Sequence, residues 1–178
     1  ITTLIELEAG TQPVHYFAGP ASAQLVLAGS GGYGFISTVE HMTGRNRGGK
    51  AFVSLAQGET LCQPSHAAGS SAGEALVPAT HVCCASVGGR VLTFELGELK
   101  LMEKGGRGLQ LIDLDAGDQL AGAAAYTRSV RLTGVGRGGK AREEVLEIRS
   151  LNNARAVRGR KGRAAEPGFR LNGVQRVQ

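Results

Sequence analysis

Several residue types and patterns are scarce in this chain of 178 residues, and each scarcity narrows the class of protein. There is no tryptophan and aromatic residues make up only 4%, so few rings are available to stack on the exposed bases of RNA. No apolar run is long enough to cross a membrane as a helix, and no signal peptide is visible. The chain starts at Ile1, inside a strand-like run, and we expect it to be part of a longer protein.

Cysteine is also sparse, with Cys62, Cys83 and Cys84 as the three examples. They show no CxxC metal spacing, and an odd, low count is typical of a reducing cytoplasm. Adjacent residues of a strand point to opposite faces, so we interpret Cys83 and Cys84 as small buried apolar side chains rather than a disulfide pair. The four histidines lack metal-ligand spacing, and no nucleophile, base and acid can be grouped by spacing. The sequence therefore predicts no catalysis by this chain alone.

The net charge of +5 is unevenly placed along the chain. Residues 1–89 carry three basic and five acidic side chains, whereas the stretch from Arg128 onward carries 13 basic and four acidic ones, a charge of +9. A concentrated basic region favours a polyanionic partner, nucleic acid first and an acidic membrane surface second. The membrane interpretation is the weaker because no basic amphipathic helix accompanies the charge.

The stretch from Gly31 to Leu55 predicts a strand, a basic glycine-rich loop and a second strand over Ala51–Leu55. The loop reads GRNRGGK over residues 44–50, with three cations among small residues. Arginine and lysine supply charge, and glycines let backbone N–H groups approach an anion, so this loop is a candidate phosphate-binding element.

Weaker copies of this arrangement follow along the chain. The pattern apolar, polar, Leu, polar, any residue, Gly ends at Gly10, Gly58 and Gly117, at intervals of 48 and 59 residues. Two further basic loops lie at residues 103–108 and 158–163. Strand-rich units that recur at such intervals predict propeller-like blades that pack on their neighbours. A single sandwich or barrel is the alternative fold.

The predicted organisation is an all-β, open, propeller-like β-pinwheel of four-stranded blades. We expect residues 1–19 to end a preceding blade, 20–64 to form a blade, 65–76 to be a flexible Ala/Gly/Ser-rich insertion, 77–122 to form a second blade and 123–178 to form a C-terminal blade.

Three stretches mimic nucleotide-binding motifs. Residues 44–50 and 134–140 match the glycine and lysine spacing of a P-loop, but Ala51 and Ala141 stand where a hydroxyl would hold Mg²⁺. Residues 29–34 match a dinucleotide-binding fingerprint, yet the following residues are strand-like where the fingerprint needs a helix. We interpret all three as turns.

Two features together resemble a known family: Gly-Tyr-Gly-Phe over Gly32–Phe35, and Arg-Asn-Arg-Gly-Gly-Lys-Ala over Arg45–Ala51. They are similar to the C-terminal domain of the ParC-type A subunit of bacterial DNA topoisomerase IV, and the related A subunit of gyrase carries the box Gln-Arg-Arg-Gly-Gly-Lys-Gly. Asn46 and Ala51 depart from that box, and the two later loops depart further. The resemblance extends along essentially the whole chain.

The resemblance implies a β-pinwheel that binds and bends duplex DNA without sequence preference, as a non-catalytic part of an ATP-dependent type IIA topoisomerase. Such a domain would orient the transported DNA segment for decatenation and supercoil relaxation. Implied partners are duplex DNA, the B subunit of topoisomerase IV, a second A subunit through its N-terminal part, and a chromosomal condensin. ATP and Mg²⁺ are implied elsewhere in the holoenzyme and no cofactor in this chain. The implied location is cytoplasmic and chromosome-associated, with a peripheral position at the inner membrane as a further expectation.

The predicted DNA-binding residues all lie in the three basic loops. They are Arg45, Arg47, Gly48, Gly49, Lys50, Lys104, Arg107, Arg158, Arg160, Lys161 and Arg163. We expect them to hold phosphates along a curved rim. The main alternative function is a protein-docking propeller with no strong DNA affinity, and an RNA-binding domain is a weaker one.

Overall fold

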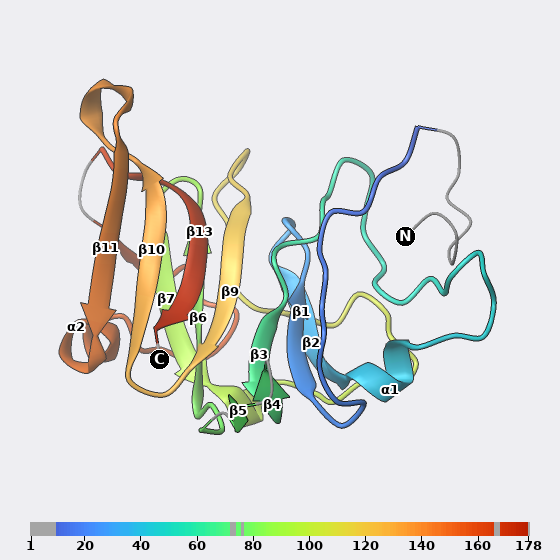
Figure 1. Ribbon diagram of the computed structural model, residues 1–178. Helices are drawn as coiled ribbons and strands as arrows, with labels where there is room; N and C mark the ends of the chain where they lie inside the picture. The colour runs from blue at the N-terminus through green and yellow to red at the C-terminus, as the bar shows by residue number, and fades with distance from the viewer. Residues whose placement is uncertain (1–9, 72–73, 76, 166–167, 178) are drawn as a thin grey trace.

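The structure is a computed structural model that describes residues 10–71, 74–75, 77–165 and 168–177. Its regular structure consists mainly of antiparallel strands in three larger sheets, which stand side by side and which we call blades 1, 2 and 3 in chain order (Figure 1). The predicted all-β, propeller-like fold is confirmed.

Blade 1 is a four-stranded sheet in the order β3-β1-β2-β8. Strands β1 (Gln24–Ala28) and β2 (Tyr33–Thr38) form a hairpin, β3 (Ser65–Ala68) pairs with β1, and β8 (Leu109–Gln110) pairs with β2. The hairpin turn ends at Gly32, whose positive φ of 84° suits glycine. The dinucleotide-like glycines at 29–34 therefore form a turn followed by a strand, as predicted.

Blade 2 repeats this topology in the order β9-β6-β7-β12. Strands β6 (His81–Ser86) and β7 (Arg90–Glu95) form its hairpin, β9 (Leu120–Tyr126) pairs with β6, and β12 (Arg163–Ala164) pairs with β7. The match between the two blades is strand for strand, which supports a structural repeat.

Blade 3 contains the first three strands of the same pattern, in the order β11-β10-β13. The strands are β10 (Ser129–Val135), β11 (Ala141–Glu147) and β13 (Arg170–Val177). In the part of the chain that the structure describes, no strand pairs with the outer edge of β11. The P-loop-like Lys140 is followed by β11, so its glycines form a hairpin turn as predicted.

The remaining elements are short and connect the blades. They are α1 (Val39–Met42), the two-stranded ribbon of β4 (Ser70–Ser71) and β5 (Glu74–Ala75), the 3₁₀ turns Leu96–Glu98 and Arg137–Gly139, and α2 (Ile148–Asn153). None of the helices in the described residues is long and apolar enough to cross a membrane.

Blades 1 and 2 are each completed by a strand from the next module of the chain. After β7 the chain returns to blade 1, where Leu101 forms a parallel bridge with Ile36 before β8. After β11 it returns in the same way to blade 2, where Arg155 bridges Thr93 before β12. The blades are therefore joined through their backbones as well as through their side chains.

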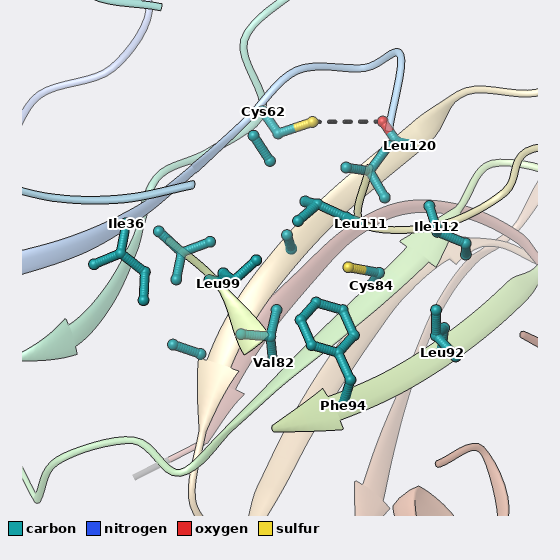
Figure 2. Close-up of a cluster of buried hydrophobic side chains, with 14 of the residues drawn as sticks. Ile36, Cys62, Val82, Cys84, Leu92, Phe94, Leu99, Leu111, Ile112 and Leu120 are labelled. Atoms are coloured by element: carbon teal, nitrogen blue, oxygen red, sulfur yellow. Dashed lines mark hydrogen bonds between the residues drawn. The ribbon is translucent and has the colours of Figure 1, made fainter. Parts of the chain in front are cut away.

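The core lies between neighbouring blades. Between blades 1 and 2, apolar residues such as Ile36, Val82, Cys84 and Phe94 form one cluster, with Cys62 at its edge (Figure 2). Each fully buried large apolar side chain contributes roughly 1.5–3 kcal/mol to folding. The sheets can only bury both faces by stacking, as the repeat predicted.

A second cluster joins blades 2 and 3 and includes Cys83, Tyr126, Val130 and Leu132. Cys83 and Cys84 thus point to opposite faces of β6, as predicted. Tyr126 is a strand residue with only 1% of its surface exposed. Burial raises the pKa of Cys62 to about 11 and that of Cys83 to about 12, so neither thiol is a ready nucleophile.

The predicted insertion at 65–76 is wrong at its start. Ser65–Ala68 forms β3, the innermost strand of blade 1, and Ala67 is fully buried. The Ser65 hydroxyl accepts a hydrogen bond from the backbone N–H of Ala125 in blade 2. Small side chains are used here because the innermost strands of adjacent blades approach closely, so the Ala/Ser composition reflects packing rather than a linker.

Two predicted strands are shorter than expected. Ala51–Leu55 forms only one parallel bridge, from Val53 to Gly106, because no blade precedes blade 1 among the described residues to pair with it. The strand expected from Leu109 stops at Gln110 because Leu111 and Ile112 leave the sheet edge and enter the core between blades 1 and 2.

The predicted blade boundaries do not coincide with the ends of the observed sheets. The boundary after residue 122 falls inside β9, and blades 1 and 2 each take a distant strand. The order of strands along the sequence cannot show that β8 belongs to blade 1 and β12 to blade 2. Residues 10–19 contain no strand, and the part of the predicted preceding blade at 1–9 lies outside the described residues.

Candidate nucleic-acid interface

The three basic loops occupy equivalent places in the three modules. Each lies between the hairpin of its module and the segment that follows: residues 103–108 precede β8, residues 158–163 lead into β12, and residues 44–50 precede the segment at 51–55. The repeat seen in the sequence is therefore also a repeat of position in the fold.

Neighbouring loops are linked by backbone hydrogen bonds. Gly106 N–H donates to Phe52 O at 2.8 Å, and Ser54 N–H donates to Gly106 O at 2.9 Å, so the segment after the first loop contacts the second. In the same way Gly159 N–H donates to Leu111 O at 2.9 Å, after the second loop. The three loops thus follow one another along the outer strands of the blades.

One glycine in each of the later loops is required for this crossing. A Cβ on Gly108 would lie 2.2 Å from Gly34 O, and a Cβ on Gly162 would lie 2.6 Å from Val91 O. Both glycines also have positive φ. The glycine after the basic residue therefore lets the chain cross closely over the preceding blade.

The first loop is open to solvent along residues 43–50. Arg45 and Arg47 form no ion pair or hydrogen bond within the part of the chain that the structure describes. Lys50 Nζ donates to His41 O at 2.7 Å and lies 5.2 Å from the centre of the Phe52 ring. A Cβ on Gly48 would meet no atom within 4 Å, so the backbone there is accessible to an anion.

The second loop contains one exposed and one paired cation. Lys104 is exposed and has no ionic partner among the described residues. Arg107 makes two hydrogen bonds to the Glu59 carboxylate, at 2.7 and 3.2 Å, and its guanidinium lies 4.4 Å from the centre of the Tyr33 ring. The charge of Arg107 is therefore balanced inside the molecule.

The third loop divides in a similar way. Arg160 and Arg163 are exposed, with no ionic partner in the described ranges. Lys161 Nζ lies 2.6 Å from Asp115 Oδ1, and Asp115 also pairs with Arg90 at 3.2 Å.

Arg158 of this loop is held by hydrogen bonds within the fold. Its guanidinium donates to Gln110 O at 2.5 Å, its backbone N–H donates to the Glu98 carboxylate, and its Nε is buried. By their environments the eleven predicted residues separate into exposed and engaged groups.

The carboxylates of the engaged pairs, Glu59 and Asp115, both have lowered pKa values. The backbone N–H of Ala56 and the guanidinium of Arg107 hold the pKa of Glu59 below its usual value. The hydrogen bond and charge of Lys161 lower the pKa of Asp115, and Asp115 raises the pKa of Lys161. Sequence reasoning missed Glu59, Arg90 and Asp115 because their partners are 25 to 48 residues away.

No group of three or more His, Cys, Asp or Glu residues in the described ranges has an arrangement suited to a metal ion.

Comparisons with known proteins agree with this geometry. A family model described as "DNA gyrase C-terminal domain, beta-propeller" matches residues 80–126. The chain is 35% identical over 164 residues to the A subunit of DNA topoisomerase 4 of Neisseria gonorrhoeae, covering 92% of this chain and 20% of the relative. It is 26% identical over 181 residues to the protein of the same name from Escherichia coli K12, covering 99% and 22%. The chain thus spans about a fifth of the length of these curated relatives.

Solved structures share the fold. The C-terminal domain of E. coli ParC matches with a TM-score of 0.77 at 24% identity, covering 97% of this chain and 68% of that one. A DNA gyrase A C-terminal domain matches with a TM-score of 0.69 at 14% identity, covering 96% and 55%.

The fold and these similarities define a β-pinwheel domain of the kind found in DNA gyrase and topoisomerase IV. Within that class, the chain is similar over nearly its whole length to the C-terminal domain of ParC, the A subunit of bacterial DNA topoisomerase IV. The resemblance first indicated by the residues around Arg45–Ala51 is confirmed.

Proposed function

We propose that this chain is a sequence-independent duplex-DNA-binding and bending domain of a type IIA topoisomerase, within the A subunit of topoisomerase IV. In this role it orients the transported DNA segment for decatenation and supercoil relaxation. The intact enzyme carries out ATP-dependent catalysis, whereas this domain is non-catalytic.

The observation that carries the proposal is the succession of basic loops along the outer strands. Five of their cations are exposed and lack an ionic partner among the described residues: Arg45, Arg47, Lys104, Arg160 and Arg163. Lys50 adds a sixth exposed cation without a carboxylate partner. Cations spaced over successive blades suit the phosphate backbone of one duplex that bends to follow them.

The same surface favours duplex DNA over single-stranded nucleic acid. No tryptophan is present, and the rings of Tyr33 and Phe52 lie against the side chains of Arg107 and Lys50. Sequence-tolerant binding of single strands depends on open aromatic faces for stacking. Phosphate contact without base stacking or base readout is the mode that the loop residues support.

The proposal extends to the partners of the intact protein. These are the B subunit of topoisomerase IV, a second copy of the A subunit through its N-terminal part, and a chromosomal condensin, with ATP and Mg²⁺ bound elsewhere in the holoenzyme. A cytoplasmic, chromosome-associated location fits a DNA partner. No feature of the described residues adds to the earlier expectation of a position at the inner membrane.

The test is a titration with a random-sequence duplex at several salt concentrations. We expect log affinity to fall linearly with log salt, by roughly 0.9 per phosphate neutralised. The triple variant Arg45→Gln/Arg47→Gln/Lys50→Gln is expected to bind more weakly to every sequence and to reduce the slope by up to about 2.7.

A matched control removes the same charge away from the loops. Arg128, Arg131 and Arg149 are exposed residues of blade 3 and its flanks, and their combined change to glutamine is expected to alter the slope much less. Equal slopes for the two triple variants would reject the loops as the contact surface. A wild-type protein without salt-dependent binding would instead support the protein-docking alternative.

A further inference from the structure

Two carboxylates recur beside the basic loops, each from an earlier module. Glu59 pairs with Arg107 of the second loop, 48 residues later, and Asp115 pairs with Lys161 of the third loop, 46 residues later. Arg107 and Lys161 stand at equivalent positions, each followed by the glycine that crosses over the preceding blade. The two cations are therefore equivalent in the repeat, whereas their carboxylates differ in position: Glu59 follows the closing glycine Gly58, and Asp115 precedes the closing glycine Gly117.

The Glu59 carboxylate takes the geometry that a phosphate would take on Arg107. Two nitrogens of the guanidinium donate to the two carboxylate oxygens, the forked arrangement that arginine also uses for phosphate. Only 15% of the Glu59 side chain is exposed, compared with 38% for Arg107. The Ala56 N–H fixes the carboxylate further by donating to Oε2 at 2.8 Å. Glu59 is thus an ordered anion held against a loop cation.

Asp115 plays the same part in a more exposed setting. Its two oxygens accept from Lys161 and from Arg90, so one carboxylate holds two cations. About 42% of the Asp115 side chain is exposed, so this pair exchanges with solvent ions more readily than the Glu59 pair does.

The first loop lacks such a carboxylate in the described residues. Lys50, which occupies the equivalent place, donates only to a backbone carbonyl, that of His41. Of the three equivalent cations, Lys50 alone therefore presents a charge that no carboxylate of the described chain balances.

We propose that Glu59 and Asp115 are affinity-setting residues, which occupy Arg107 and Lys161 in the place of DNA phosphates. This inference rests on the proposed function. Phosphates that approach the second and third loops must compete with these carboxylates and are repelled by them. DNA therefore engages the loop cations that have no carboxylate partner in the described residues in preference to Arg107 and Lys161.

Single neutralising variants test the inference in the DNA titration. Glu59→Gln and Asp115→Asn are each expected to tighten binding, by up to roughly tenfold at low salt, and to steepen the salt slope by up to about 0.9. The matched control is Glu143→Gln, which also removes one negative charge and breaks an exposed ion pair, to Arg131 at 3.6 Å, on blade 3. The control slope is expected to remain that of the wild type.

A double variant separates competition from a general charge effect. If Glu59 acts by occupying Arg107, the gain in slope from Glu59→Gln disappears in Glu59→Gln/Arg107→Gln. Glu59→Asp, which keeps the charge but shortens the side chain, is expected to bind DNA as the wild type or slightly tighter. Thermal melts of every variant confirm that each compared protein is folded.

The possible outcomes are distinct. Wild-type binding that depends on salt, combined with Glu59→Gln and Asp115→Asn slopes equal to that of Glu143→Gln, overturns this inference and leaves the proposed function standing. A lowered melting temperature without a steeper slope also overturns it, since the pairs would then only join modules. Absence of salt-dependent binding in the wild type rejects the proposed function and this inference together.

Discussion

At the scale of single residues, the glycines of this chain fall into two kinds that the sequence does not distinguish. Gly108 and Gly117 have nearly the same backbone conformation, with φ of 81° and 78°. A Cβ on Gly108 would lie 2.2 Å from Gly34 O, whereas one on Gly117 would meet nothing within 4 Å. The first glycine serves a close approach of two backbones, and the second serves only a turn.

This difference gives a prediction for two alanine variants. Gly117→Ala is expected to cost about 1 kcal/mol, the cost of placing a side chain in the left-handed region. Gly108→Ala carries the same cost and must also displace the backbone carbonyl of Gly34 in β2. We therefore expect its free energy of unfolding to fall by at least about 2 kcal/mol more than that of Gly117→Ala. Urea unfolding of both variants measures the difference. Equal losses would show that the crossing adjusts without strain.

At the scale of elements, the pair of Glu59 and Arg107 joins one module to the loop of the next. The pKa of Glu59 is lowered in the folded protein, so the unfolded chain binds more protons as pH falls. The stabilisation is therefore complete above the ordinary pKa of 4.5 and is lost as pH falls through the lower folded value.

The corresponding prediction compares Glu59→Gln with the wild type across pH. The wild type is expected to melt at a higher temperature near neutral pH. The gap is expected to begin to shrink near the ordinary pKa of 4.5 and to close as pH falls through the lower pKa of folded Glu59. Thermal melts in a series of buffers measure the gap. A gap of the same size at neutral and acid pH would mean that the variant acts through packing and not through the ion pair.

The strands differ in whether the sequence alone predicts them. The hairpins of β1–β2 and β6–β7 were predictable because apolar strands flank tight glycine turns. Strands β8 and β12 were not, because two residues carry no periodic signal and their partners lie in another module. The same limit applies to the site: the cations were found from the loops, but which of them remain exposed depends on distant acids such as Glu59.

At the scale of the whole molecule, net charge is a poor guide to which cations remain exposed for the proposed DNA contact. The sequence from Arg128 onward has a charge of +9, yet several of its cations are engaged within the fold. Arg155 pairs with Glu95, Arg176 donates to Val77 O, and Arg158 is partly buried against Gln110 O. The first loop, in the half of the chain with a negative net charge, presents as many cations to solvent as either later loop.

The exchange of strands also makes the three blades mechanically dependent on one another. Blade 1 contains β8 from the second module, and blade 2 contains β12 from the third. Loss of the second module would therefore remove a strand from blade 1, and loss of the third module would remove a strand from blade 2. Two apolar clusters, each shared by adjacent blades, add to this dependence.

We therefore expect one cooperative unfolding transition rather than one per blade. Leu132→Ala, which opens a cavity between blades 2 and 3, is expected to destabilise the protein by about 2–5 kcal/mol. It should also speed the labelling of Cys84, which lies between blades 1 and 2 and does not share that cluster. Circular dichroism follows all three sheets in urea, and thiol labelling follows the buried cysteines. If the dichroism and labelling curves coincide in urea and shift together in the variant, the three blades unfold in one transition. Cys84 would then become exposed only when the whole protein unfolds. If Leu132→Ala left the labelling of Cys84 unchanged while lowering the dichroism midpoint, the blades would unfold separately, and the exchanged strands would contribute little to their coupling.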